Sequence, residues 1–387
     1  MKAWVICYLL FCSTFFFWPQ TQAKTFRFIA KMPLGTASHE RIFLTGNQTE
    51  LCHWKPNCIA MEKVDLNTFS ADVELQDFQK LEYKVTRGSW DQEAADAFAQ
   101  PYRNSFLIAD QPLQILDISN WKDWGPRQIA KRLQIISGFK SKHLGRQVTL
   151  RILHPNKKHD HRQKQAKGKV KRKLKLPVIY AQDGQNLFDP WLSWNQNDWQ
   201  VDRALELMAK SEDVYIVGID SGPERMQEYE YSKRGNLYAR FLIEELKPWI
   251  EKNFAVSPRR EDNFLMGSSM GAVIAIETLW LHSDIFSKAA GLSISVFDQA
   301  SPIDSLIENN FPAQPVSIYL DNGEIGEDFD FIRSVPLFAK TLKAKSPKSQ
   351  IFQRSFPFFD HQESDWARRL TVPLGFLLAL PRPTIAR

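Results

Sequence analysis

Residues 263–280 read NFLMGSSMGAVIAIETLW, in which two adjacent serines lie between two glycines. The apolar residues before the glycines predict a buried strand, and the longer apolar run after them predicts a helix. The segment GSSMG (267–271) fits the pattern G-x-S-x-G, a strained strand-to-helix turn that exposes its central serine, here Ser269. The pattern alone also fits an ordinary tight turn. Whether Ser269 is a nucleophile therefore depends on a base, an acid and an oxyanion site elsewhere in the chain.

A base for Ser269 is expected later in the chain, because the order in folds with this turn is serine, acid, histidine. Only two of the eight histidines follow Ser269. His282 lies at the far end of the predicted helix, on the order of 15 Å away by helical rise, and is expected to be a surface or packing residue. His361, in the segment FPFFDHQESDWARRL, remains as the candidate base.

The acid is expected just after the predicted strand VSIYL (316–320). The loop that follows, DNGEIGEDFD (321–330), contains five carboxylates. An acidic loop is usually only a solvated one, and the sequence pattern does not choose among Asp321, Glu324, Glu327, Asp328 and Asp330.

Two backbone N–H groups are needed to hold an oxyanion. One normally belongs to the residue after the nucleophile, here Met270, and the other to a loop after an earlier strand. The stretch LPVIYAQDGQNLFD (176–189) is predicted to be that strand and loop, with DGQN (183–186) at the turn. DGQN alone would be an ordinary turn, but the four required parts occur here in the expected order.

The first 23 residues, MKAWVICYLLFCSTFFFWPQTQA, have an early lysine, an apolar run of about a dozen residues and a small-residue ending. This pattern predicts a secretory signal peptide, with a signal anchor as the alternative. No later segment approaches the length of a membrane span, so no span is expected after signal removal. The protein is therefore expected to be secreted or periplasmic.

Export would remove two of the four cysteines together with the signal peptide. Without residues 1–23 only Cys52 and Cys58 remain, on either side of HWKPN. An oxidising compartment favours a disulfide between them. Zinc is disfavoured because His53 alone cannot complete a tetrahedral site.

The remaining chain divides into parts of different pattern. Residues 24–120 contain short runs rich in β-branched and aromatic residues, which predict a small β-sandwich. Residues 121–144 are interpreted as a linker. In residues 145–387 strand-like runs alternate with longer helical patterns, which predicts an α/β domain with a mostly parallel sheet covered on both faces.

The net charge of +6 is concentrated in residues 157–175, which contain ten lysines and arginines and no aromatic residue. A nucleic-acid tract is disfavoured, since nucleic-acid binding usually comes with a recognisable fold or a stacking platform. A solvated surface loop is the preferred interpretation, and it could attract an anionic polymer or surface. No nucleic-acid partner is expected.

Residues from about 145 to 380 resemble the "putative esterase" branch of the α/β-hydrolases, which have a doubly wound sheet. The branch includes enterochelin esterases, feruloyl and acetyl-xylan esterases, S-formylglutathione hydrolases and mycolyltransferases. The resemblance is carried by VIYAQDGQNLFD, VGIDSGPERMQEYEY, FLMGSSMGA, IYLDNGEIGED and HQESDWARRL.

The resemblance implies roles for individual residues. It makes Ser269 the nucleophile and His361 the general base. In that family the acid follows a glycine by three or four residues; counted from Gly323 this favours Glu327, with Asp328 as the second choice.

The resemblance also adds residues around the pocket. The Gln185 amide would join that of Met270 as an oxyanion donor. Arg225 and Tyr229 would lie at the pocket mouth and contact substrate, with a structural salt bridge and a packed ring as the alternative.

The first domain is similar to starch-binding carbohydrate-binding modules, on the stretches TELCHWKPNCIAMEKVDLNTFSADVEL and KLEYKVTRGSWD. Trp54 and Trp90 match aromatic positions there, so the resemblance implies a glucan site. The alternative is a spacer or lid domain with Trp54 in its core.

The leading hypothesis is an exported serine carboxylic-ester hydrolase that works through an acyl-enzyme, with no metal and no organic cofactor. Its substrate would be a small-molecule or polysaccharide ester, either of a carbohydrate or of a siderophore-like compound. One alternative is an acyltransferase of the same fold, and another is a non-catalytic polysaccharide-binding protein. S-formylglutathione hydrolysis is disfavoured because export separates the enzyme from that cytosolic substrate.

Overall fold

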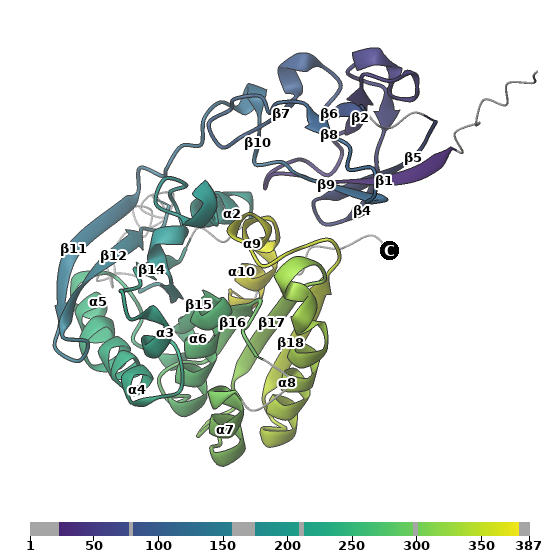
Figure 1. Cartoon of the computed structure of the whole chain (residues 1–387). Helices are drawn as coiled ribbons and strands as arrows, with labels where there is room; N and C mark the ends of the chain where they lie inside the picture. Colours follow the sequence, from purple (N-terminus) through teal and green to yellow (C-terminus); the bar gives the residue numbers. More distant parts are fainter. Residues whose placement is uncertain (1–22, 77–79, 157–174, 209–212, 297–300, 379–387) are drawn as a thin grey trace, which may run out of the picture.

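The computed structural model describes residues 23–378 except 77–79, 157–174, 209–212 and 297–300 (Figure 1). The predicted signal peptide and the basic segment 157–175 fall almost entirely outside the described residues. The described chain forms a β-sandwich followed by an α/β domain, as the sequence predicts. Every helix in the described ranges is too short or too polar to cross a membrane.

The sandwich contains two four-stranded sheets within the described residues. One has the order β4 (Glu62–Asp65), β5 (Thr68–Leu75), β1 (Lys24–Lys31), β9 (Leu113–Asp117), and the other β3 (Ile59–Ala60), β2 (Phe43–Gly46), β6 (Glu82–Thr86), β8 (Ser105–Phe106). Buried and more exposed side chains alternate along most of β5, as expected for a strand with one face on a core. Phe28 of β1 and Tyr83 of β6 meet in that core with ring centroids 5.0 Å apart.

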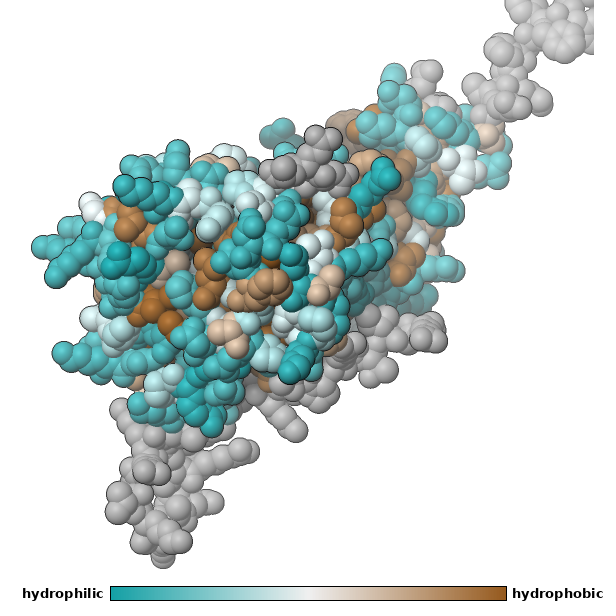
Figure 2. Space-filling view, turned by 90° about the horizontal axis from the view of Figure 1, so that it is seen from below, coloured by the Kyte–Doolittle hydropathy of each residue, from teal (hydrophilic) through white to brown (hydrophobic). Residues whose placement is uncertain are grey.

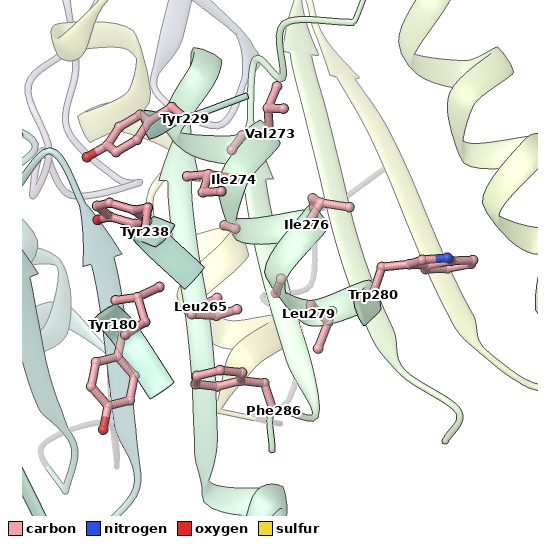
Figure 3. Packing of buried hydrophobic residues seen from close by; sticks show 14 of the residues in the cluster. Tyr180, Tyr229, Tyr238, Leu265, Val273, Ile274, Ile276, Leu279, Trp280 and Phe286 are labelled. Carbon is pink, nitrogen blue, oxygen red and sulfur yellow. The ribbon is translucent and has the colours of Figure 1, made fainter. Parts of the chain in front are cut away.

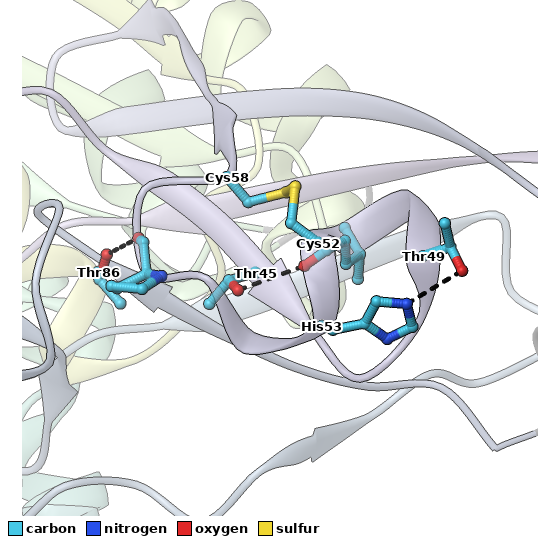
Figure 4. The surroundings of a disulfide bond; sticks show 8 residues. Thr45, Thr49, Cys52, His53, Cys58 and Thr86 are labelled. Carbon is cyan, nitrogen blue, oxygen red and sulfur yellow. Dashed lines mark hydrogen bonds between the residues drawn. A yellow bond between two sulfur atoms is a disulfide. The ribbon is translucent and has the colours of Figure 1, made fainter.

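Cys52 and Cys58 form the predicted disulfide, which closes the turn around the 3₁₀ helix Thr49–Trp54 (Figure 4). The hydroxyl of Thr45 donates to the backbone oxygen of Leu51 at 3.4 Å, and the His53 ring lies 3.2 Å from the Thr49 hydroxyl. These contacts fix the conformation of the loop that carries Trp54.

A short segment joins the two domains. It contains β10 (Asn120–Trp121), which pairs with β7 (Ala94–Ala95). Arg127 then binds Asp198 at 3.0 Å and also contacts Asp202, both buried in the larger domain. Residues 133–141, which fall within the predicted linker, form an edge strand of the larger sheet. The connection is thus held to the α/β domain over much of its length.

The described part of the larger domain is built on an eight-stranded sheet. Its order is β11 (Leu133–Ser141), β12 (Arg146–Leu153), β14 (Tyr215–Ile219), β13 (Val178–Gln182), β15 (Asn263–Ser268), β16 (Lys288–Leu292), β17 (Ser317–Gly323), β18 (Gln350–Phe356). The strands from β14 to β18 pair in parallel, and β11 and β12 pair antiparallel at one edge. The predicted mostly parallel sheet is confirmed.

Helices cover both faces of this sheet (Figure 1). One face packs against α4 (Lys233–Arg240), the π-helical turn Phe241–Leu246, α5 (Lys247–Asn253), α6 (Ser269–Leu281), α7 (Pro302–Asn309) and α8 (Phe331–Lys345). The other face packs against α2 (Val201–Leu207), α9 (Glu363–Arg369) and α10 (Thr371–Leu377). The α9 and α2 end of this layer lies toward the sandwich (Figure 1).

The centre of the first face is α6, whose residues 271–280 are all buried. Its apolar side chains, among them Ile274, Ile276 and Leu279, pack against Leu265 of β15 (Figure 3). A helix enclosed on all sides is expected to be apolar around its whole circumference, and α6 is so except for the buried Glu277 and Thr278. The start of α6, at the serine pair, is therefore held rigidly.

By contrast, one outer face of the molecule is mostly hydrophilic, with small scattered hydrophobic groups (Figure 2).

Candidate active site

The predicted strand–turn–helix at the serine pair is present. β15 ends at Ser268, and α6 begins at Ser269, whose φ of 54° is in the left-handed region. A side chain at position 267 would lie 2.2 Å from the backbone oxygen of Gly271, so only glycine fits there. Ser268 is buried, whereas Ser269 is partly exposed. The turn therefore presents Ser269 and hides its neighbour.

His361 lies against Asp328, with 2.7 Å between Nδ1 and a carboxylate oxygen of Asp328. The Asp328 side chain is fully buried. Glu327, the acid favoured from the sequence, is exposed and contacts this region through its backbone N–H, which donates to Asp360 at 2.9 Å. Both residues belong to the short 3₁₀ helix Gly326–Asp330, where successive side chains point about 120° apart. Only one of two neighbours can face His361, and the prediction of Glu327 in that place is wrong.

The second oxygen of Asp328 accepts hydrogen bonds from the Gly323 N–H at 2.6 Å and from the Ser293 hydroxyl at 2.5 Å. Burial raises the pKa of Asp328, but the hydrogen bond from His361 and the charge of Arg369, 3.7 Å away, hold it below its ordinary value. Asp328 is therefore a buried, ionised and firmly oriented partner for the imidazole.

Ser293 orients Asp328 in turn. Its hydroxyl oxygen accepts from the Trp366 indole N–H at 2.9 Å and from the Arg369 guanidinium at 2.7 Å. With two donors on the oxygen, the single hydroxyl hydrogen is directed to Asp328. Arg369 also binds the buried Asp321 at 3.0 Å, which leaves its charge balanced. The side chains of Ser293, Trp366 and Arg369 thus form a hydrogen-bonded network that fixes Asp328, and through it His361.

Ser269 and His361 line one cavity of about 810 Å³. In the free protein the Ser269 hydroxyl is 3.1 Å from that of Ser295. The remaining walls are mostly polar and include Asp183, Gln185, Asn186, Ser193, Asn195, Arg225, Asp360, Gln362 and Glu363. The volume is in the range of small-molecule sites.

Of the two predicted oxyanion donors, Gln185 lines this cavity and Met270 directly follows Ser269 in the chain. Gln185 lies in the 3₁₀ helix Gly184–Asn186 after β13, and its side chain exchanges two hydrogen bonds with Ser221, at 2.9 and 3.1 Å. This pairing ties the amide side chain to the neighbouring loop. Met270 is in the first turn of α6, where backbone N–H groups have no partner within the helix.

Arg225 and Tyr229, expected together at the mouth, occupy different layers. Arg225, at the start of α3 (Arg225–Glu228), lines the cavity and binds both oxygens of Asp183 at 2.7 and 2.8 Å. Tyr229 is fully buried, its hydroxyl accepts from the Asp183 N–H at 3.3 Å, and its ring packs 5.2 Å from that of Tyr238. The expectation that Tyr229 contacts substrate is therefore wrong, because Asp183 and Arg225 cover it.

Glu363 is a cavity residue that the sequence patterns do not predict. It is buried, lines the cavity two residues after His361, and accepts from the Asn186 side chain at 3.3 Å. Burial raises the pKa of Glu363 to about 7. The one sequence feature that points to Glu363 is its position two residues after His361. No sequence feature points to Ser293 as a partner of Asp328.

A hydrophobic rim borders this polar cavity. Trp194 and Leu192 line the opening and are 70% and 51% exposed. The neighbouring Trp191 is 68% exposed and packs on Phe98 of the sandwich, with ring centroids 4.4 Å apart. Exposed aromatic residues grouped at a cavity mouth are typical of a ligand contact surface.

Trp54 and Trp90 lie together on the sandwich, and neither lines this cavity. Both are partly exposed, and their ring centroids are 6.4 Å apart. They form a paired aromatic surface, so Trp54 is not a core residue.

Comparisons with known proteins agree with this architecture. The family model described as "Putative esterase" matches residues 141–377, and the model described as "Starch binding domain" matches residues 25–104. The enterochelin esterase of Shigella flexneri is 16% identical with a TM-score of 0.51, over 91% of each chain. The BES protein of Bacillus cereus is 19% identical with a TM-score of 0.50, over 65% of this chain and 96% of its own. At these identities the likeness concerns the fold.

A curated relative, the uncharacterized protein YbbA of Bacillus subtilis, is 24% identical over 132 residues. The match covers 30% of this chain and 49% of YbbA, so it spans about half the length of that relative. The esterase model, in contrast, covers more than half of this chain and includes Ser269, Asp328 and His361. The chain belongs to the putative esterase family, and its larger domain is an esterase domain of the α/β fold.

Proposed function

We propose that this protein is an exported serine carboxylic-ester hydrolase in which Ser269, His361 and Asp328 form the catalytic triad. The observation that carries the proposal is that Ser269, raised at a strand-to-helix turn, opens on the same cavity as a histidine paired at 2.7 Å with a buried carboxylate. Export is supported by the pattern of residues 1–23 and by the Cys52–Cys58 disulfide.

In the proposed reaction the Ser269 hydroxyl turns from Ser295 toward His361 as substrate binds, and attacks the ester carbonyl. The Nε2 atom of His361 takes the hydroxyl proton, while Asp328 holds Nδ1–H and stabilises the imidazolium. The N–H groups of Met270 and Gln185 hold the oxyanion. His361 then returns the proton to the departing alcohol. Water, activated by His361, hydrolyses the acyl-enzyme and frees Ser269.

The walls of the cavity favour an ester of a carbohydrate over a siderophore-like polyester. Carboxylates and amides such as Asn186, Asn195 and Glu363 can pair with several hydroxyl groups at once. The exposed ring of Trp194 offers an apolar face at the opening. A planar aromatic surface beside many hydrogen-bonding groups suits a sugar ring, which has apolar faces and polar edges.

The test combines hydrolysis with covalent labelling. The purified protein is assayed with p-nitrophenyl esters from acetate to octanoate, before and after treatment with a fluorophosphonate. We expect hydrolysis that the reagent abolishes, with one label per chain located on Ser269 by peptide mass spectrometry. A label on another residue would contradict the triad. A folded protein that hydrolyses no ester would favour an acceptor-dependent acyltransferase or a non-catalytic polysaccharide-binding protein.

A second candidate function, binding of a glucan by the sandwich, is favoured by the Trp54–Trp90 pair. Replacing Trp90 with alanine is expected to weaken retention on insoluble starch at least about 10-fold, because an aromatic anchor carries much of the binding energy of such a surface. Hydrolysis of p-nitrophenyl acetate should not change. The matched control is Phe106→Ala, which removes an aromatic ring of the same domain that is 67% exposed. Equal retention by both variants would exclude a Trp54–Trp90 glucan site.

A further inference from the structure

The sandwich and the esterase domain meet at an ion cluster near His361 in the sequence, in which Lys31, Asp365 and Arg368 are buried and Asp117 is partly open to solvent. Lys31, the last residue of β1, is 1% exposed and donates to the carboxylate of Asp365 at 2.8 Å. Asp365 is in α9 of the other domain and is fully buried. Arg368 binds the other oxygen of Asp365 at 2.8 Å, and Asp117 of the sandwich completes the cluster at 3.1 Å from Lys31 and 2.7 Å from Arg368.

The cluster contains two cations and two anions. Burial raises the pKa of Asp365, but Lys31 and Arg368 outweigh it and hold the pKa below its ordinary value. Removing a charged ammonium group from water costs free energy of desolvation unless the group is paired with an anion. Lys31 has one carboxylate partner in its own domain, Asp117, and its shorter contact, at 2.8 Å, is to Asp365 of the esterase domain. Arg368 further binds the backbone oxygens of Met32 and Ile118 in the sandwich, at 3.1 and 3.0 Å.

This cluster reaches the catalytic loop through Asp365. The oxygen that accepts from Lys31 also accepts from the backbone N–H of Asp360 at 2.7 Å. Asp360 in turn accepts, through its side chain, from the N–H of His361 at 2.6 Å and of Glu327 at 2.9 Å. Asp360 thus joins the loop that contains His361 to the loop that contains Asp328. Lys31 binds the Asp365 carboxylate, which in turn binds the backbone of Asp360.

We propose that Lys31 of the sandwich is a positioning residue for His361, so that the starch-binding-like domain is part of the catalytic framework as well as a binding module. The proposal rests on the proposed esterase function. Without the ammonium group, the shared oxygen of Asp365 would keep a longer hydrogen bond from the Gln362 side chain, at 3.3 Å, but lose its charged donor at 2.8 Å. The turn at Asp360 would then be free to shift, and a shift of about 1 Å in a catalytic group can cost on the order of 100-fold in rate.

The experiment compares Lys31→Met with Lys84→Met in the full chain. Lys84 is a matched control because it also lies in the sandwich and pairs with a carboxylate, Glu93, at 2.7 Å, but both partners belong to the same domain. The number of competent sites is titrated with the fluorophosphonate, so that kcat refers to folded protein. For Lys31→Met we expect kcat for p-nitrophenyl acetate to fall about 10- to 100-fold with KM little changed. Lys84→Met should retain the wild-type kcat.

Equal kcat per titrated site in the two variants would overturn the proposal, since loss of folded protein alone would lower the number of sites and not their rate. If Lys31→Met does not fold, Lys31→Gln, which keeps a hydrogen-bond donor, is compared with Lys84→Gln under the same criterion. Failure of the esterase function itself is distinguishable, because the wild-type protein would then hydrolyse no ester and take no label on Ser269.

Discussion

Replacing Ser269 with alanine is expected to lower kcat for p-nitrophenyl acetate by about 10⁶-fold, the loss found when a serine hydrolase is left without its nucleophile. The physical reason is that no acyl-enzyme can form, so only transition-state binding by the oxyanion donors remains. The fold should be unaffected, since the turn depends on the glycines and α6 is enclosed along residues 271–280. Steady-state hydrolysis and thermal unfolding check the two parts of this expectation.

Two neighbouring serines serve as controls for Ser269. Ser268 stands beside it in the turn but is buried, and Ser295 is its hydrogen-bond partner at 3.1 Å. Ser268→Ala should leave kcat close to that of the wild type. Ser295→Ala removes only a contact of the resting state, so its effect should be far smaller than that of Ser269→Ala. If Ser269→Ala keeps the wild-type rate while Ser295→Ala is inactive, the nucleophile has been assigned to the wrong residue.

The turn at Ser269 could be predicted because its signal is local. An apolar strand, two glycines and an apolar helix lie within residues 263–280, and their chemistry requires one geometry. His361 followed from chain order, since only two histidines come after the serine. The sheet followed from the alternation of strand and helix, which specifies parallel pairing without reference to any single contact.

The acid could not be chosen in the same way. Five carboxylates lie within residues 321–330, and which of them faces His361 depends on the direction of a 3₁₀ turn and on what encloses it. Asp328 is held in this place by hydrogen bonds from the Ser293 hydroxyl and the Gly323 N–H, which come from other parts of the sheet edge. The spacing of the carboxylates in residues 321–330 does not indicate which of them receives these hydrogen bonds.

The prediction for Tyr229 failed for a related reason. Its distance along the chain from the DGQN turn gave no indication that Asp183 and Arg225 would pair above it. Lys31 illustrates the same limit between domains, because a lysine at the end of a strand is ordinarily solvated, and its partner, Asp365, lies far away in the sequence. Long-range polar pairing is the part of this site that sequence reasoning missed.

The second large effect is expected for Asp328. Replacing it with asparagine should lower kcat by about 10⁴-fold, because an amide facing Nδ1 favours the wrong imidazole tautomer and cannot stabilise the imidazolium. Since the pKa of Asp328 is below its ordinary value, its pairing stabilises the fold above the ordinary pKa and is lost as the pH falls through the lowered value. Assays between about pH 6 and 9 therefore compare an ionised aspartate with a neutral amide.

Glu327→Gln is the matched control for Asp328→Asn, because it makes the same chemical change at the adjacent residue. Glu327 lines the cavity but is exposed, and its backbone supplies the contact with Asp360, so kcat should fall far less than in Asp328→Asn. Near-ultraviolet circular dichroism and thermal unfolding would verify that each variant retains its fold. A large loss for Glu327→Gln with an active Asp328→Asn would mean that the loop rearranges on substrate binding and that Glu327 is the functional acid. The opposite result would show that the contact at 2.7 Å in the free protein is the one used in catalysis.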